Sequence, residues 1–156
     1  MTAYVDTIGF NKGSAAHRDK SPMAYCVSVN LDFAAIKVAR LAAGASILAT
    51  NDSLAIIQVP AKTFVIAVGL DITTANTNAG TVDVGGSVEA NVDSWIDGVD
   101  PTSTGSAVGL GTLYGTNAAG NYQNAADTLD MLFLTGPQDT SVMRLWAVMV
   151  DCAGPE

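Results

Sequence analysis

The stretch that decides the fold is residues 64–85, FVIAVGLDITTANTNAGTVDVG. A strand sends successive side chains to opposite faces, so apolar residues at every second position predict a half-buried β-strand over 64–74. Along the opposite face the residues change from apolar to polar toward the C-terminal end of the strand. That end is therefore expected near the rim of a sheet. In this interpretation the buried face consists of Phe64, Ile66, Val68, Leu70 and Ile72.

A turn and a second strand follow. The turn ANTNAG carries Asn76, Asn78 and Gly80, residue types that tolerate positive φ or bond their own backbone. Val82 and Val84 then alternate with polar residues. The whole stretch is therefore predicted to be a β-hairpin.

Similar patterns occur elsewhere, whereas a helix has weak support. At 33–43, FAAIKVARLAA, the alanines and Asp32 as an N-cap favour a helix. The apolar residues of this segment do not gather on one helical face, so we expect strand or irregular chain there. Further strands are predicted at 24–32, 53–59, 128–134 and 141–150, with 88–96 and 107–115 as candidates inside the irregular segment 85–127.

Many short strands separated by turns indicate an all-β fold. We expect a jelly-roll-like β-sandwich that forms a single domain over 24–156 and is preceded by an extended N-terminal arm, residues 1–23. The arm is polar and contains glycine and serine. Far-ultraviolet circular dichroism should show little helix.

The last predicted strand, 141–150, is apolar on both faces. Such a strand is either central in its sheet or covered on its outer face by another subunit. Only one face can line the core of a two-layer sandwich, so the second face is a candidate protein interface. The candidate interface residues on this strand are Val142, Trp146 and Val148.

Composition also points to a protein partner. Hydrophobic residues make up 49% of the 156 residues and charged residues only 14%, so some apolar surface is expected to be covered. No apolar run reaches the roughly 18 residues of a membrane span, which argues against a membrane protein. The N-terminus has no apolar signal region, so we expect a cytoplasm-like compartment of synthesis.

Charge divides the chain into two parts. Residues 1–40 hold five bases and three acids, a net of 5 − 3 = +2, and residues 41–156 hold two bases and twelve acids, a net of 2 − 12 = −10. Either the acids simply keep an apolar β-protein soluble, or the basic N-terminal arm docks on an acidic partner. An acidic body argues against nucleic acid. The arm residues proposed for docking are Lys12, Arg18 and Lys20.

Catalytic signatures are weak. The single histidine, His17, lies in the arm, where a catalytic base would lack a rigid position beside its nucleophile. The glycines of GLGTLYG at 109–115 lack the lysine of a phosphate-binding loop and are expected to form a turn region. Cys26 and Cys152 have no metal-ligand spacing and are expected to be buried free thiols.

One acidic cluster is a candidate cation site. Asp93, Asp97 and Asp100 lie close together in VDSWIDGVDP, with Glu89 just before them. Loop carboxylates can bind calcium, but the EF-hand spacing is absent. We expect no cofactor and no metal-dependent fold. Glycoside hydrolysis would need two carboxylates in a cleft, and a sugar-binding surface could involve Trp95, Tyr114 and Tyr122.

The order of these patterns resembles the β-sandwich decoration (cement) proteins of tailed bacteriophages over residues 24–151. The features that carry the resemblance are an Ala/Gly turn, a strand, Pro-Ala-Lys-Thr, a long strand, an Asn-rich turn, TVDVG, and ADT leading into a strand. The resemblance implies a non-enzymatic virion protein on the capsid exterior, made in the host cytoplasm. It also implies homo-oligomers, often trimers, that bind the major capsid protein.

Three hypotheses stand. The first is a capsid-stabilising decoration protein, and the second is a carbohydrate- or receptor-binding β-sandwich of a fibre or tail. The third is an enzyme. An exposed aromatic row at 95–122 would favour sugar binding, and a flat apolar patch around the terminal strand would favour assembly.

Overall fold

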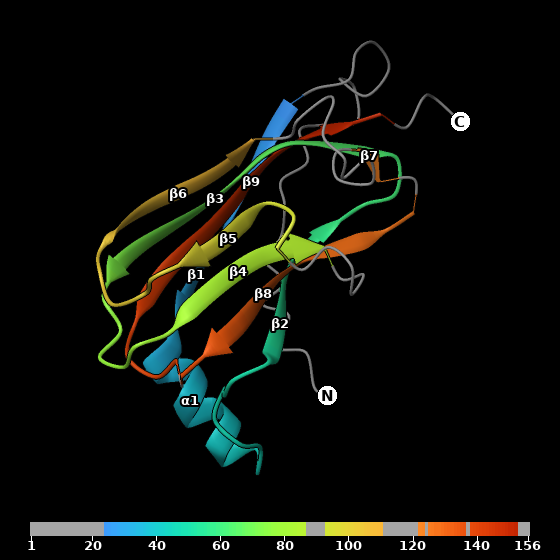
Figure 1. Ribbon diagram of the computed structural model, residues 1–156. Helices are drawn as coiled ribbons and strands as arrows, with labels where there is room; N and C mark the ends of the chain where they lie inside the picture. The colour runs from blue at the N-terminus through green and yellow to red at the C-terminus, as the bar shows by residue number, and fades with distance from the viewer. Residues whose placement is uncertain (1–23, 87–92, 111–121, 124, 137, 153–156) are drawn as a thin grey trace.

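The computed structural model describes residues 24–86, 93–110, 122–123, 125–136 and 138–152. Two antiparallel sheets pack face to face, with one short helix at one end (Figure 1). The predicted all-β sandwich is confirmed. No helix in the described ranges is long and apolar enough to cross a membrane.

The sheets have a regular strand order. Sheet A has the order β1-β9-β3-β6, with β7 pairing with β3, and sheet B has the order β2-β8-β4-β5. The strands of sheet A are β1 Ala24–Asp32, β3 Thr63–Thr74, β6 Gly105–Leu110, β7 Tyr122–Gln123 and β9 Val142–Asp151. Those of sheet B are β2 Asp52–Val59, β4 Thr81–Gly86, β5 Ile96–Val99 and β8 Asp127–Thr135.

Most connections pass from one sheet to the other. From β1 to β4 and again from β7 to β9, each strand lies in the opposite sheet from the strand before it. Such alternation between two sheets, each with a main order of four strands, is typical of a jelly roll. The predicted jelly-roll-like topology is therefore present.

The predicted hairpin over 64–85 is wrong. β3 belongs to sheet A and pairs with β9, β6 and β7, whereas β4 belongs to sheet B and pairs with β8 and β5. The turn between them therefore spans the two layers. Local turn chemistry cannot distinguish these outcomes, because strand partners come from distant parts of the chain.

The predicted buried face of β3 is correct for only part of the strand. A β-bulge shifts the register of β3 against β9 between Val65 and Ala67. Val68, Leu70 and Ile72 face the core as predicted, but before the bulge the buried residue is Val65. The extra residue of the bulge, Ile66, is 38% exposed. One inserted residue reverses the facing of all side chains before it.

Residues 33–43 form a helix, so the expectation of strand or irregular chain is wrong. α1 spans Phe33–Ala42, and the Asp32 carboxylate caps it by accepting a hydrogen bond from the Ala35 N–H at 3.1 Å. Phe33 and Ile36 pack inward, whereas Val38 and Leu41 are exposed. The apolar residues do not gather on one face because α1 presents apolar side chains both inward and outward.

The other predicted strands are close to the observed ones. The prediction at 24–32 matches β1, and those at 53–59, 128–134 and 141–150 match β2, β8 and β9 within one residue at each end. The candidate 107–115 overlaps β6, and its part beyond 110 lies outside the described residues. In the candidate 88–96, residues 88–92 lie outside the described residues as well. Residues 93–95 form a turn, and β5 begins at Ile96.

The prediction that both cysteines are buried is wrong. Cys26 and Cys152 are free thiols, and both are exposed. On β1 the residues that face the core are Val27, Val29 and Leu31, so Cys26 lies on the outer face by strand alternation. Cys152 follows the end of β9.

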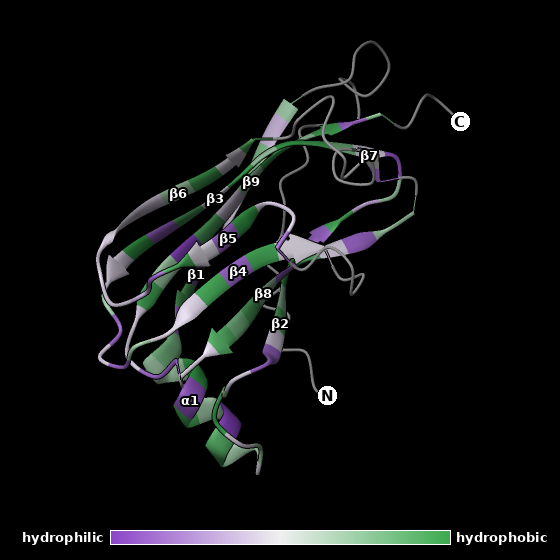
Figure 2. Ribbon diagram, in the orientation of Figure 1, coloured by the Kyte–Doolittle hydropathy of each residue, from purple (hydrophilic) through white to green (hydrophobic). Residues whose placement is uncertain are grey.

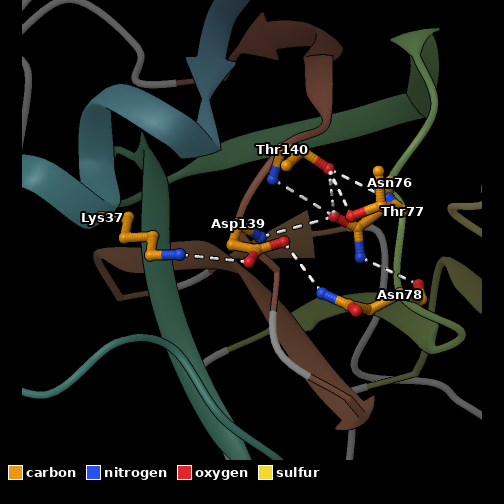
Figure 3. Close-up of polar contacts among 6 residues, drawn as sticks. All are labelled: Lys37, Asn76, Thr77, Asn78, Asp139 and Thr140. Atoms are coloured by element: carbon orange, nitrogen blue, oxygen red, sulfur yellow. Dashed lines mark hydrogen bonds and ion pairs between the residues drawn. The ribbon is translucent and has the colours of Figure 1, made fainter.

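A polar network joins α1 to the two connections that cross between the sheets (Figure 3). The Asn76 side-chain oxygen accepts hydrogen bonds from the Thr140 hydroxyl at 3.1 Å and from the backbone N–H groups of Asp139 and Thr140 at 3.4 and 3.3 Å. The Asp139 carboxylate accepts a hydrogen bond from Asn78 at 2.9 Å and pairs with Lys37 of α1 at 3.2 Å. The network therefore fixes α1 relative to both layers.

Candidate interaction surface

The outer face of sheet A is the candidate functional surface. Three strand-to-strand rows cross it in register. They are Ser28–Trp146–Gly69–Val108, Cys26–Val148–Ala67–Leu110 and Ala24–Val150–Phe64. These rows contain no charged residue, and they place apolar side chains from four strands beside one another. These three rows therefore form a continuous and mostly apolar part of the face.

Exposure on this surface is unequal. Leu110 is 71% exposed, Val108 is 54% exposed and the bulge residue Ile66 is 38% exposed. Residues on the central strands are more covered by their neighbours. Apolar residues lie along β3 and along its pairing partner β9 (Figure 2). Large exposed apolar patches mark interaction sites on soluble proteins.

Trp146 lies across Gly69 on this surface. A β-carbon built at Gly69 would be 2.1 Å from the Trp146 ring, so only glycine leaves room for the indole to lie against the sheet. The ring is half-buried. Gly69 therefore keeps this part of the surface flat, because the side chain of any larger residue would push the indole outward.

A polar row, Asn30–Arg144–Asp71–Ser106, borders the apolar rows toward the α1 end of the sheet. The Arg144 guanidinium donates to Asp71 Oδ2 from Nε at 2.9 Å and from Nη2 at 2.6 Å. Burial raises the pKa of Asp71, but hydrogen bonds from Arg144, Ser106 and Trp146 outweigh it, and the pKa is lowered overall. Because Arg144 is exposed, this pair gives little net stability.

The sequence-predicted interface residues fall in two places. Val142, Trp146 and Val148 are half-buried on the outer side of β9, which is a central strand of sheet A. Lys12, Arg18 and Lys20 lie outside the described residues, as does His17. β1 begins at Ala24, at the end of the sandwich opposite α1 (Figure 1).

The sequence did not single out the most exposed apolar residues. Val108 and Leu110 lie in a glycine-rich segment, and Val38 and Leu41 lie on a helix that was not expected. A usable signal was the alternation of Ala107, Val108, Gly109 and Leu110, in which Val108 and Leu110 share one side of the strand. Their outward direction depends on the register with β3.

The aspartate cluster is divided in the structure. The Asp100 carboxylate accepts hydrogen bonds from the backbone N–H and hydroxyl of Thr102, at 2.8 and 2.7 Å. Asp93 and Asp97 instead lie near Asp83, whose carboxylate accepts the Gly98 N–H at 2.8 Å. In the described part of the chain no group of three His, Cys, Asp or Glu side chains could hold a metal ion.

Two sheet B carboxyls have pKa values above their ordinary value. Burial raises the pKa of Asp83 against the opposing Gly98 hydrogen bond, and the negative charges of Asp97 and Asp93 raise it further. Burial likewise raises the pKa of Asp130, with Thr128 opposing and Asp127 adding to the effect. Each ionised carboxylate therefore costs folding free energy at neutral pH.

We expect Asp83→Asn to stabilise the fold at pH 7. A group whose folded pKa lies above its unfolded pKa destabilises the native state at high pH, and this cost disappears as pH falls through the folded pKa. The stability advantage of Asp83→Asn should therefore shrink as pH is lowered from 7 toward 4. Urea unfolding of the wild type and the variant across this pH range measures the difference in stability. An advantage that grows as pH falls would contradict the raised pKa of Asp83.

An aromatic sugar-binding row is not found among the described side chains. Trp95 packs against the hydrophobic core, and its carbonyl oxygen lies where a β-carbon at Gly109 would be. The residue Tyr114 and the side chain of Tyr122 lie outside what the structure describes.

Comparisons with known proteins identify fold relatives only. No protein-family model and no curated protein matches the sequence. Among solved structures, a chain in the capsid of Ralstonia phage GP4 matches with a TM-score of 0.60 at 11% identity, over 90% of this chain and 94% of that one. A chain in the cyanophage Pam1 capsid asymmetric unit matches with a TM-score of 0.57 at 13% identity, over 90% and 99%.

A third match is a chain in the acid-stable capsid structure of Helicobacter pylori bacteriophage KHP30. Its TM-score is 0.56 at 12% identity, over 84% of this chain and 90% of that one. Because each alignment covers most of both chains, all three matched chains are about as long as this one. At these identities the likeness shows a shared fold.

Proposed function

We propose that this protein is a non-enzymatic structural component of a phage virion that binds and stabilises the outer surface of the capsid, as a decoration protein does. The observation that carries the proposal is the match of the whole sandwich to chains of similar length in three phage capsid structures. A fold alone does not define a function, so the surface of this chain must support it as well.

The outer face of sheet A supplies that support. It is apolar over three adjacent rows and exposes Ile66, Val108 and Leu110. A broad surface without charge in these rows suits a stable protein–protein contact better than a small-molecule site, which is concave and has a few convergent polar groups. We infer that copies of the protein associate with one another through this surface.

A direct test is to rebuild the particle. Virions stripped of this protein should rebind the purified chain at regular positions on the capsid exterior, and the decorated particles should resist heating better than stripped ones. Cryo-microscopy locates the added density. Density at the tail or on a fibre, or no binding at all, would contradict the proposal.

We expect Trp146→Ser to weaken association more than it weakens the fold. Removing the indole takes a large apolar group from the centre of the surface, whereas the core side of β9 keeps Leu145 and Ala147. Sedimentation velocity and thermal unfolding measure the two effects separately. A matched control is Asn30→Ser, on the polar row of the same face. If Trp146→Ser unfolds the isolated protein, the surface assignment fails.

The arm is proposed to bind the major capsid protein. Residues 1–23 include Lys12, Arg18 and Lys20, together with the apolar Tyr4, Ile8 and Phe10. Each exposed ion pair to a carboxylate contributes only about 0.2–1 kcal/mol, so several contacts must act together. Salt screens such pairs, so arm-dependent attachment weakens as ionic strength rises.

Deleting residues 1–20 should lower occupancy on stripped particles, and the loss should be largest at low ionic strength. Occupancy is measured by quantitative gel analysis of purified particles at low and high salt. A neutralised variant, with Lys12, Arg18 and Lys20 replaced by glutamine, separates the role of charge from that of length. Unchanged occupancy after deletion would show that the arm does not bind the capsid.

A further inference from the structure

Asp83 is the one charged residue in the described part of the chain that is buried, with an exposure of 3%. It lies on β4, and its register partner on β8 is the apolar Leu132. A carboxylate that leaves water costs free energy unless a positive charge or several hydrogen-bond donors compensate for the lost hydration. An ionised Asp83 therefore needs such a partner to be stable.

The surroundings of Asp83 in sheet B contain no positive charge. Residues 63–143 include no lysine, arginine or histidine, and the strands of sheet B carry five aspartates and no base. The described residues give the carboxylate one hydrogen-bond donor, the Gly98 N–H at 2.8 Å. The charges of Asp97 on β5 and Asp93 in the preceding turn repel that of Asp83. A proton is therefore the ligand that can neutralise Asp83 in this setting.

The neighbouring strand β8 adds no compensating charge. Its titratable residues are Asp127 and Asp130. Asp130 lies opposite Gly85 of β4, two residues from Asp83, so it occupies the same outer face of sheet B. Asp100, which follows β5, has a pKa lowered by hydrogen bonds within its own turn and remains mostly ionised down to about pH 4. The described titratable groups of β5, β8 and the turns beside β5 are therefore all acids.

The strand that Asp83 holds is the edge strand β5, which is attached by few contacts. β5 has four residues and pairs with β4 at two register positions, one on either side of Asp83, with an irregularity between them. Gly98 lies at this irregularity with a φ of +70°, and its N–H bonds to the Asp83 carboxylate. The attachment of β5 therefore depends on the state of the Asp83 carboxyl group.

We propose that Asp83 is a pH-sensitive link, which closes β5 against β4 when it is protonated and lets β5 open locally when it is ionised, while the rest of the sandwich stays folded. A neutral carboxyl group still accepts the Gly98 N–H, so protonation keeps this hydrogen bond and removes the buried charge and its repulsion by Asp97. Burial raises the pKa of Asp83 in the closed form. Closure is therefore favoured most at low pH, and this advantage is lost as pH rises through the raised pKa.

Opening of β5 would also reach sheet A. Trp95, immediately before β5, donates its N–H to the Val84 carbonyl of β4 at 3.0 Å. Its own carbonyl oxygen lies against Gly109 of β6, in the place that a β-carbon would occupy. Gly109 stands between Val108 and Leu110, the most exposed apolar residues of the outer face of sheet A. The link at Asp83 therefore supports one edge of the candidate surface.

The test is amide hydrogen exchange of the full chain followed by NMR, corrected for the intrinsic pH dependence of exchange. Between about pH 7 and about pH 4, protection of the Gly98 and Val99 amides should rise about threefold or more, and by at most about tenfold per pH unit, the limit for one proton. Amides of β8 should stay better protected throughout, because they report global unfolding. Asp83→Asn keeps an acceptor without the charge, so its β5 amides should show the high protection at every pH.

Two further variants separate this link from a general effect of charge. Asp130→Asn removes a carboxylate from the same face of sheet B and should leave the pH dependence of β5 protection unchanged. Asp97→Asn changes an exposed residue and should raise β5 protection at pH 7, which decides the matter if Asp83→Asn does not fold. Protection of β5 that is independent of pH in the wild type overturns the proposal. So does a pH dependence that survives in Asp83→Asn or disappears in Asp130→Asn, or exchange of β5 and β8 at one common rate.

Discussion

Replacing Phe33 with alanine should lower the free energy of unfolding by about 3–5 kcal/mol, the usual cost of deleting a buried aromatic ring. The side chain is fully buried and meets Phe133 edge-to-face, with ring centroids 5.5 Å apart. It joins α1 to sheet B across the end of the sandwich, so its loss leaves a cavity and releases the start of the helix. Urea unfolding monitored by circular dichroism measures the effect.

Two controls define what the loss means. Phe33→Leu keeps most of the apolar volume and should cost about 1 kcal/mol. Val38→Ala removes an apolar side chain from the same helix, but at a position 68% exposed, and should change stability by less than about 0.5 kcal/mol. If Phe33→Ala costs no more than Val38→Ala, then α1 is not anchored through Phe33.

Replacing Asn76 with alanine should cost about 2–3 kcal/mol, because a buried acceptor is removed from several donors at once. Asn76 is only 4% exposed, and its oxygen accepts from the Asp139 N–H, the Thr140 N–H and the Thr140 hydroxyl. Its side-chain N–H group also donates to the Asn78 carbonyl at 2.9 Å. Without it, the two crossing connections lose their shared partner.

The matched control is Asn78→Ala in the same turn. Asn78 is half-buried and makes one side-chain contact to Asp139, so we expect a loss below about 1 kcal/mol. Equal losses for the two variants would contradict the central role of Asn76. Hydrogen exchange at residues 138–141 gives a second measurement, with faster exchange expected for Asn76→Ala than for Asn78→Ala.

The local patterns of the sequence determined most strand positions. Alternation of apolar and polar residues over 24–32 and the dense apolar run at 141–150 give β1 and β9 nearly residue for residue. These patterns are reliable because each strand contacts a core on at least one face, and burial selects the same residue types wherever the strand is placed. The all-β class follows from them.

Strand partnership and facing were decided only by the tertiary structure. The hairpin predicted at 64–85 fails because β9 and β8, far along the chain, pair with β3 and β4 in separate sheets. The bulge at Ile66 appears in the sequence as one more apolar residue, yet it reverses the facing of the residues before it. Turn residues permit a chain reversal, but they do not choose the sheet that the next strand joins.

For the helix and the candidate surface, too, the sequence contains the local features and the tertiary structure decides their arrangement. The sequence contains both the Asp32 cap and the apolar residues of α1, but a helix with apolar side chains on opposite faces has no single stripe to detect. The sequence also marks β9 as apolar on both faces. That its outer face joins Gly69, Val108 and Leu110 in one surface depends on register across four strands, which arises from long-range pairing and not from local preference.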